Sequence, residues 1–358
     1  MKKTLVALAA LAATSSVFAM GHAAAGSSVT LYGRIDAAVV TVDKANANNQ
    51  RITSLGDSTM ATSIWGLRGS EDLGGGLRGT FNIEGDVQTT NGQTSAAGVF
   101  RRAANVGLEG GFGSLTLGTR LNPLIASWAG MQVASTNSVF VTYSAAAGFA
   151  DFFTKNAITY TSPKLANLVT VQVQHGLSNT AGAAQAGSMT SFNITAAPVG
   201  PVELRAAYQD QKASASTTAS NTTGLNKKTT LLGAKGLFGP ATAGLILFKN
   251  EVSTFAAPGT KTIDVEGYQL SGSYSLSKQV LLAASYTNFD SQISGQGKSS
   301  LTNLQARYIF SPRTTAYFQV GASDNAASGI AVSPAWTVVP GVANKKQNAV
   351  GAGVVHTF

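Results

Sequence analysis

One short stretch decides the fold: residues 202–209 read Val-Glu-Leu-Arg-Ala-Ala-Tyr-Gln. Val202, Leu204 and Tyr208 stand on alternate positions of this stretch. Glu203 and Gln209 occupy positions between them. A period of two places successive side chains on opposite faces of a β-strand. One face of this strand therefore suits an apolar environment, and the other suits water.

The same alternation recurs along the chain, for example over residues 169–174, 268–275 and 303–308. About 16 such segments of roughly ten residues are present, and ten residues is the length that a tilted strand needs to cross a bilayer. Short turns are predicted near residues 71–76, 110–113, 163–167, 197–201, 238–241, 276–279 and 311–313. Longer polar loops alternate with them, near residues 44–58, 90–98, 121–155, 179–188, 211–228, 252–263, 290–299 and 323–346. This pattern predicts an all-β fold, a 16-stranded antiparallel transmembrane β-barrel.

The composition agrees with a barrel and excludes several other classes. Charged residues make up 11% of the 358 residues, which is low for a soluble surface, whereas a barrel has an apolar outer belt and a lumen that uncharged polar residues can line. The chain has no cysteine, which excludes a disulfide-stapled module and a thiolate metal site. Lysine and arginine form no run of five or more, so no nucleic-acid partner is expected.

The first 25 residues have the pattern of a secretory signal peptide. Lys2 and Lys3 precede a short apolar run and then small residues, and the run is too short for a membrane anchor. Cleavage after Ala19 or after Ala25 fits the pattern, and the second is favoured because it falls just before the first strand. We therefore expect a signal peptide at 1–25 and a barrel at 26–358. Removing two lysines and no acids leaves 23 basic and 16 acidic residues, a net charge of +7.

No motif supports catalysis, a cofactor or a metal. Residues 74–79 satisfy the G-x-G-x-x-G pattern, but another strand follows where a nucleotide-binding motif needs a helix. A glycine hairpin is the simpler interpretation. His175 and His356 share the parity of the apolar faces of their strands, so neither is expected to face a lumenal substrate. An outer-membrane hydrolase or protease remains the enzyme alternative.

Several motifs resemble a known family. They are the segment 27–33 with Asp36, the segment 66–77, the segments 100–102, 106–108 and 112–118, and the last residues 356–358. Together they resemble the trimeric general porins of Gram-negative outer membranes, particularly the beta-proteobacterial branch. The resemblance implies a homotrimer in outer-membrane lipid that lets small hydrophilic solutes, ions and anions diffuse passively. It also implies that Phe358 is a signal read by the barrel-assembly machinery, beside its simpler role as an aromatic belt residue.

The resemblance also implies that residues 121–155 fold into the lumen and form its constriction. The candidate charges are Asp151 and Lys155 in this loop, Arg120 at its entrance, and Arg34, Arg68, Arg78, Arg101, Asp36, Glu84 and Asp86 on the wall. Relatives carry arginine where this chain has Ile64 and Phe153. Arg101 is retained, so we expect it to dominate a mild preference for anions.

Two other functions fit the same fold. Residues 121–155 carry several aromatic side chains and few charges, so they could form the binding site of a solute-specific porin. A structural or adhesive barrel without conductance is the second alternative. Saturable flux would identify the first, and a planar-bilayer recording would identify the second.

Overall fold

The computed structural model describes residues 26–134, 151–197, 200–213, 224–254, 259–325, 330–335 and 338–358. The predicted signal peptide at 1–25 and the central part of the predicted inner loop, residues 135–150, lie outside the described residues. Among the described residues, no helix is both long and apolar enough to cross a membrane.

The described residues form a single sheet of 17 strands. The first nine are β1 (Ser28–Asp43), β2 (Ile52–Asp57), β3 (Ile64–Gly74), β4 (Leu77–Asp86), β5 (Ala103–Gly110), β6 (Gly113–Leu121), β7 (Phe153–Thr161), β8 (Val169–Gly176) and β9 (Met189–Ala196). The others are β10 (Val202–Gln211), β11 (Leu225–Phe238), β12 (Ala241–Thr254), β13 (Lys261–Ser275), β14 (Val280–Ser291), β15 (Lys298–Ser311), β16 (Thr314–Asp324) and β17 (Lys346–Thr357). The helix α2 (Pro123–Met131) lies between β6 and β7.

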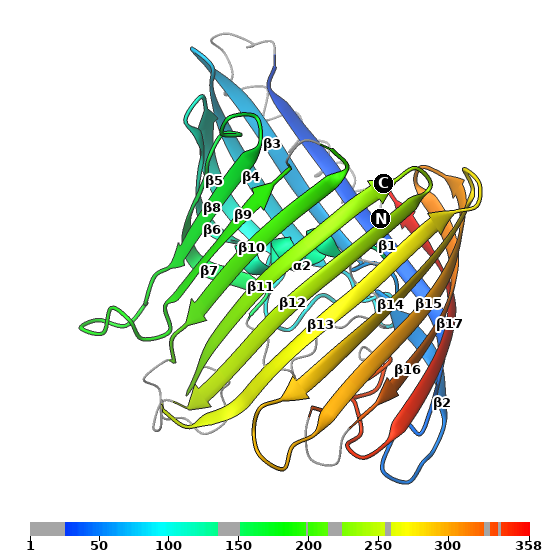
Figure 1. The fold of residues 1–358 in the computed structure, drawn as a ribbon. Helices are drawn as coiled ribbons and strands as arrows, with labels where there is room; N and C mark the ends of the chain where they lie inside the picture. Colours follow the sequence, from blue (N-terminus) through cyan, green and yellow to red (C-terminus); the bar gives the residue numbers. More distant parts are fainter. Residues whose placement is uncertain are drawn as a thin grey trace.

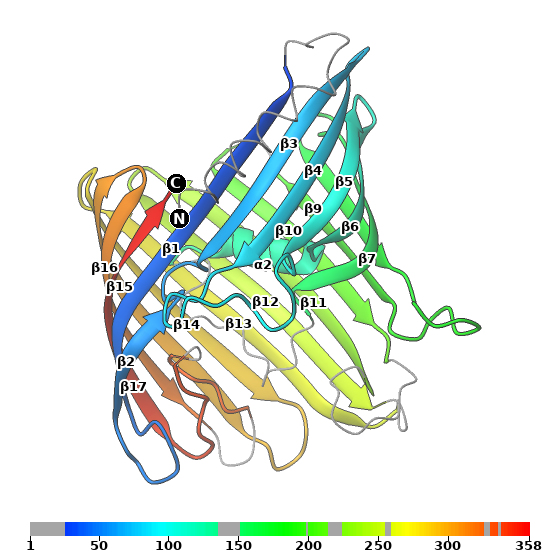
Figure 2. The same cartoon turned by 180° about the vertical axis from the view of Figure 1, so that it is seen from behind.

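The sheet closes into a barrel because β1 pairs antiparallel with β17 (Figures 1 and 2). On its other edge, β1 pairs with two strands in turn. Its residues 37–42 pair with β2, and its residues 28–34 pair with β3. Since β2 and β3 share one position in the ring, the 17 strands make 16 positions. The predicted 16-stranded antiparallel barrel is confirmed.

One predicted loop is wrong in its second half. Residues 44–58 were expected to form a single loop, but Ile52–Asp57 form the strand β2. β1 is 16 residues long, and β3 reaches only as far along it as Arg34. Without β2, the far half of β1 would expose an unpaired edge, which is costly at a membrane. The other long loops agree with the prediction within a few residues.

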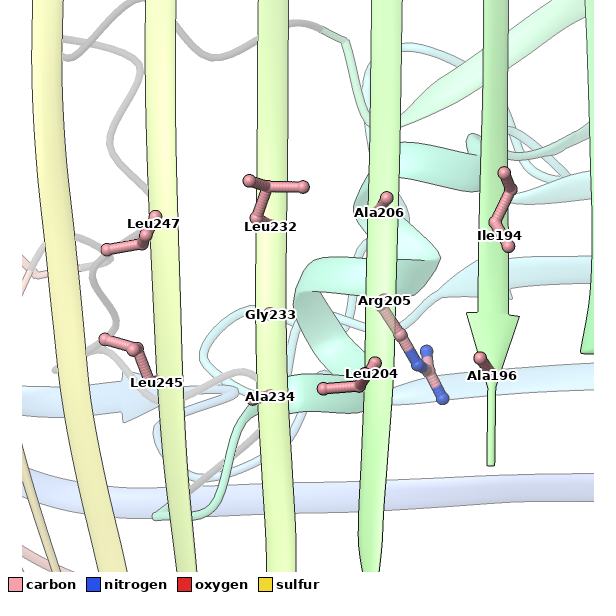
Figure 3. A pocket seen from close by; sticks show the side chains of 10 residues that line it. All are labelled: Ile194, Ala196, Leu204, Arg205, Ala206, Leu232, Gly233, Ala234, Leu245 and Leu247. Atoms are coloured by element: carbon pink, nitrogen blue, oxygen red, sulfur yellow. The ribbon is translucent and has the colours of Figure 1, made fainter. Parts of the chain in front are cut away.

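The predicted alternation of faces is confirmed. Leu204 and Leu232 are 46% and 53% exposed on the outside, whereas the inward side chains of Gln174, Gln209 and Gln269 are almost completely buried. Figure 3 shows the outer face of β10, β11 and β12, where leucines surround a shallow depression and α2 lies behind the sheet. The outer face therefore suits lipid.

The helix α2 lies inside the ring of strands (Figures 1 and 2). Its start is encoded locally: Asn122 caps it by accepting a hydrogen bond from the Leu124 backbone N–H at 2.8 Å, and Pro123 occupies the first turn. Trp128 and Met131 of the helix are buried in an apolar cluster that includes Leu231 of β11 and Phe248 of β12 and extends to inward side chains of β13 to β15. This inner wall was expected to be polar. On β11 and β12, where the helix covers it, this wall instead carries buried apolar side chains.

The glycine turn between β3 and β4 has the conformation that the sequence predicted. Gly74, Gly75 and Gly76 have φ values of 83°, 62° and 80°, which favour glycine. The G-x-G-x-x-G pattern is therefore a hairpin, as predicted, and no helix follows it.

Candidate functional site

A cavity of about 740 Å³ lies on the inner wall formed by β1 and by β3 to β7. Its charged lining residues are Arg68, Arg78, Arg102, Arg120, Glu84 and Glu109. Four arginines and two glutamates give the lining a formal charge of +2. The cavity brings together four of the predicted site residues, namely Arg68, Arg78, Arg120 and Glu84.

Arg68 and Arg78 carry the most accessible positive charge of this wall. Both are exposed. The Arg68 guanidinium lies 5.1 Å from the centre of the Tyr32 ring, and Arg78 donates a hydrogen bond to Ser70 Oγ at 2.7 Å. Neither forms an ion pair with any residue that the structure describes. Their charge is therefore available to a solute.

Arg101, by contrast, is ion-paired. It contacts Asp86 through Nε, and its guanidinium lies 5.5 Å from the centre of the Phe153 ring. Asp86 is buried and also accepts from Arg102 at 3.3 Å. The predicted residues Arg101 and Asp86 thus lie together, but each largely neutralises the charge of the other.

The prediction missed Arg102. Its Nε donates to Glu84 at 2.6 Å, and its guanidinium lies 4.9 Å from the centre of the Phe153 ring. The strand β5 begins only at Ala103, so strand parity does not extend to Arg101 and Arg102. Both side chains can therefore reach the inner wall. The signal in the sequence that could have identified Arg102 was its position directly beside Arg101.

Arg34 and Arg120 are partly buried in the same wall. Arg34 donates through Nε to the Thr62 backbone carbonyl at 3.0 Å. Arg120 donates through Nη1 to Thr116 Oγ1 at 3.1 Å. A guanidinium has five N–H groups, so this hydrogen bond leaves Arg120 with further donors toward the cavity that it lines.

Asp36 has a different position from the other predicted acids. Its side chain is completely buried and accepts hydrogen bonds from the Met60 and Ala61 backbone N–H groups at 2.7 and 2.6 Å. The Thr59 and Tyr317 hydroxyls also donate to it. Asp36 therefore holds residues 58–63, which connect β2 to β3 and are called the connecting segment below, against the inner wall.

Two predicted residues lie near the end of the loop 121–155. Asp151 accepts from Gln211 Nε2 at 3.0 Å and from Lys227 Nζ at 3.1 Å, so it joins the loop to β10 and β11. Lys155 is exposed and lies at a register shift in β7, where Arg120 pairs with Thr154.

Three cations that the prediction did not select bind backbone carbonyls of residues 123–134, which are called the α2 segment below. Arg205 donates to the Ala126 carbonyl at 3.0 Å, Lys235 donates to the Gly130 carbonyl, and Arg307 donates to the Ala134 carbonyl. In Figure 3, Arg205 lies on β10 between Leu204 and Ala206, and the helix lies behind this strand. Of these three carbonyls, that of Gly130 lies in the last turn of α2, where a cation is favourable. Inward parity marked Arg205 and Arg307, but their carbonyl partners depend on tertiary structure.

Phe358 joins the two ends of the barrel. Its backbone N–H and carbonyl exchange hydrogen bonds of 3.0 Å with Gly33 of β1. Its side chain is 44% exposed. This residue therefore extends the β17 to β1 pairing that closes the ring.

The histidines lie where the parity placed them. His175 and His356 are exposed, and each contacts a threonine hydroxyl at 2.9 Å. Within the described ranges, no group of three or more His, Asp or Glu side chains is placed to hold a metal ion.

The closed antiparallel ring, the apolar outer face and the charged inner wall define a transmembrane β-barrel protein. The sequence profile of the Gram-negative porins matches residues 7–328. The chain therefore belongs to the Gram-negative porin family and is an outer-membrane protein.

Individual relatives agree with this assignment. Outer membrane porin protein 32 of Delftia acidovorans is 46% identical over 123 residues, which are 34% of this chain and 33% of that protein. The major outer membrane protein P.IB of Neisseria meningitidis serogroup B is 34% identical over 128 residues, 35% of each chain. The chain thus matches about a third of the length of these curated relatives.

Solved structures show the same fold. The anion-selective porin from Comamonas acidovorans superposes with a TM-score of 0.78 at 24% identity, over 93% of this chain and 100% of that one. OmpT of Vibrio cholerae superposes with a TM-score of 0.69 at 15% identity, over 94% and 99% of the two chains.

Proposed function

We propose that this protein is a passive diffusion channel for small hydrophilic solutes and ions, with a mild preference for anions. The observation that carries the proposal is the inner-wall cavity, whose lining has a formal charge of +2. Charged side chains that line a pore attract ions of the opposite sign and oppose the others. The solute gradient alone drives the flux.

The preference for anions is mild for two reasons. Arg101 and Arg102 are ion-paired with Asp86 and Glu84. These carboxylates largely neutralise the two positive charges. The remaining exposed charges act only over about 8 Å at physiological salt. Arg68, Arg78 and Arg120 are then the main source of the preference.

We also propose that residues 121–155 form the constriction. The described ends of this segment support the proposal: α2 lies inside the ring, with its side chains buried against the inner wall, and Asp151 is bound to Gln211 and Lys227. A pore is most selective where it is narrowest, so the charges that face the lumen at this segment without being bound to it should matter most.

The test is a planar-bilayer recording of the purified protein, with chloride and potassium gradients. We expect steps of conductance that are linear in voltage, and a reversal potential that favours chloride and shrinks as the salt concentration rises. A well-inserted protein without conductance would instead support the structural or adhesive barrel. Cation selectivity would contradict the role given to the arginines.

We propose further that the protein forms a homotrimer and that Phe358 contributes to recognition by the barrel-assembly machinery, as the family resemblance implies. The apolar outer face supports contacts with lipid and with neighbouring copies. Chemical cross-linking in outer membranes, followed by electrophoresis with and without heating, tests the trimer. Cross-linked protein that migrates only as a monomer would contradict the homotrimer.

A further inference from the structure

The inner-wall cavity combines two kinds of surface. Ile64, Leu121 and Phe153 give it an apolar side. Arg102 and Arg120 line the same cavity, and Arg102 lies over the Phe153 ring. A pore that only attracts simple ions needs the charges and has no use for the apolar side.

Phe153 is held in place by its surroundings. It pairs with Leu121 at the end of the β6 and β7 pairing, and its ring lies 6.2 Å from that of Phe152. The guanidiniums of Arg101 and Arg102 lie within 5.5 Å of its centre. These contacts fix an aromatic ring beside the cations.

From this juxtaposition we propose that the cavity is a weak binding site for aromatic carboxylates, a class of solute with a flat apolar body and one negative group. The inference rests on the proposed channel function and specifies one solute class for it. The carboxylate pairs with the guanidiniums of Arg68 and Arg120, because a guanidinium binds a carboxylate through two parallel hydrogen bonds. The ring packs against Phe153 and Ile64.

The size and the charges of the cavity agree with such a ligand. Its volume of about 740 Å³ falls within the ~300–1,000 Å³ that is typical of small-molecule sites. Glu84 and Glu109 also line it, but Arg102 donates to Glu84 at 2.6 Å. An anion therefore meets a net positive lining, and the open lumen keeps the binding weak enough for the solute to leave.

The experiment measures the block of chloride current through single channels by three added anions. These are benzoate, cyclohexanecarboxylate, which has similar size without a flat ring, and acetate, which has no apolar body. We expect a saturable block by benzoate at lower concentrations than by either of the other two. An equal block by all three would overturn the proposal, because charge alone would then explain it.

Two variants assign the block to the cavity. Phe153→Leu keeps an apolar side chain and removes the ring, so the half-blocking concentration of benzoate should rise about two- to tenfold, the range of an aromatic pair. Arg68→Gln should weaken the block by every carboxylate. Phe318→Leu is the matched control, since Phe318 is exposed on the outer face and its loss should change nothing. An unchanged benzoate block in both Phe153→Leu and Arg68→Gln would overturn the site.

Failure of this inference is distinguishable from failure of the proposed function. The chloride current itself reports the channel in every recording. A wild-type protein that conducts chloride but shows no saturable block by benzoate contradicts the binding site alone. A protein without chloride current contradicts the channel.

Discussion

The ring of Phe358 lies directly over Gly33. The two residues exchange backbone hydrogen bonds of 3.0 Å, and a Cβ atom added at Gly33 would overlap with Cζ of the Phe358 ring and lie 2.7 Å from the Ile64 carbonyl. Glycine at this position lets the aromatic ring cover the closing pair of strands. The tight packing at this end of the closing strand pair thus requires glycine at position 33.

The first prediction concerns Gly33. Gly33→Ala should lower barrel stability by about 1–3 kcal/mol, because the added methyl group overpacks a tight contact. The measurement is the temperature at which the folded barrel unfolds in detergent, followed by electrophoretic mobility. Gly111→Ala is the matched control, since nothing lies within 4 Å of that position. Equal unfolding temperatures for both variants would show that the contact does not matter.

The second prediction concerns Phe358 and assembly. Deleting Phe358 should sharply lower the amount of protein in the outer membrane, because it removes both the ring and the last backbone pair with Gly33. Phe358→Ala keeps the backbone pair and Phe358→Tyr keeps an aromatic ring, so the two variants separate these contributions. Immunoblots of outer-membrane fractions provide the measurement. Wild-type levels of the deletion would remove the assembly role.

The third prediction compares two arginines. Sequence reasoning expects Arg101 to dominate anion preference, but the structure pairs Arg101 with Asp86 and leaves Arg68 exposed without an ion pair among the described residues. Arg68→Gln should therefore move the chloride-to-potassium permeability ratio further toward unity than Arg101→Ser does. Reversal potentials in a salt gradient measure the ratio. A larger effect of Arg101→Ser would restore the original assignment.

The fourth prediction concerns Asp36 and the connecting segment. Asp36→Ala leaves the buried N–H groups of Met60 and Ala61 without their acceptor, and each such group costs about 1–3 kcal/mol. The unfolding temperature should fall, and the single-channel current should become noisier as residues 58–63 move. Asp43→Ala is the control on the same strand, because Asp43 pairs with Arg51 on the surface. A quiet, stable Asp36→Ala channel would contradict the holding role.

The fifth prediction concerns the cations that hold the α2 segment. Lys235→Met removes the donor to the Gly130 carbonyl, so current fluctuations should increase while the chloride-to-potassium ratio changes little. Arg68→Gln should show the opposite pattern. Single-channel recordings of both variants in the same salt give noise and selectivity together. A shift in selectivity as large as that of Arg68→Gln would mean that Lys235 acts on ions directly.

Sequence reasoning predicted most of the fold, because alternation with a period of two is a local signal. The outward leucines such as Leu204 and the inward glutamines such as Gln209 lie where it placed them. It failed at β2, whose strand conformation depends on an edge that β1 presents. β1 presents this edge because β3 pairs with only part of its length. Residues 52–57 themselves give no sign of it.

The site was harder to predict, because parity gives a face and says nothing about partners. The side chains of Arg68 and Arg78 line the cavity on the predicted inner wall. Asp36 has the predicted parity, but its contacts with Met60 and Tyr317 depend on segments far apart in the chain. Arg102 lies before its strand begins, where parity has no meaning.

The cations on two sides of the barrel lumen differ in how accessible they are to a solute. On the side of β10, β11 and β15, the side chains of Arg205, Lys235 and Arg307 are held by hydrogen bonds to backbone carbonyls of residues 126–134. On the side of β3 and β4, Arg68 and Arg78 remain exposed. We expect an anion to pass closer to the wall of β3 and β4, because the guanidiniums there can pair with it directly. A solute with a permanent dipole would be turned as it passes, with its negative end toward that wall.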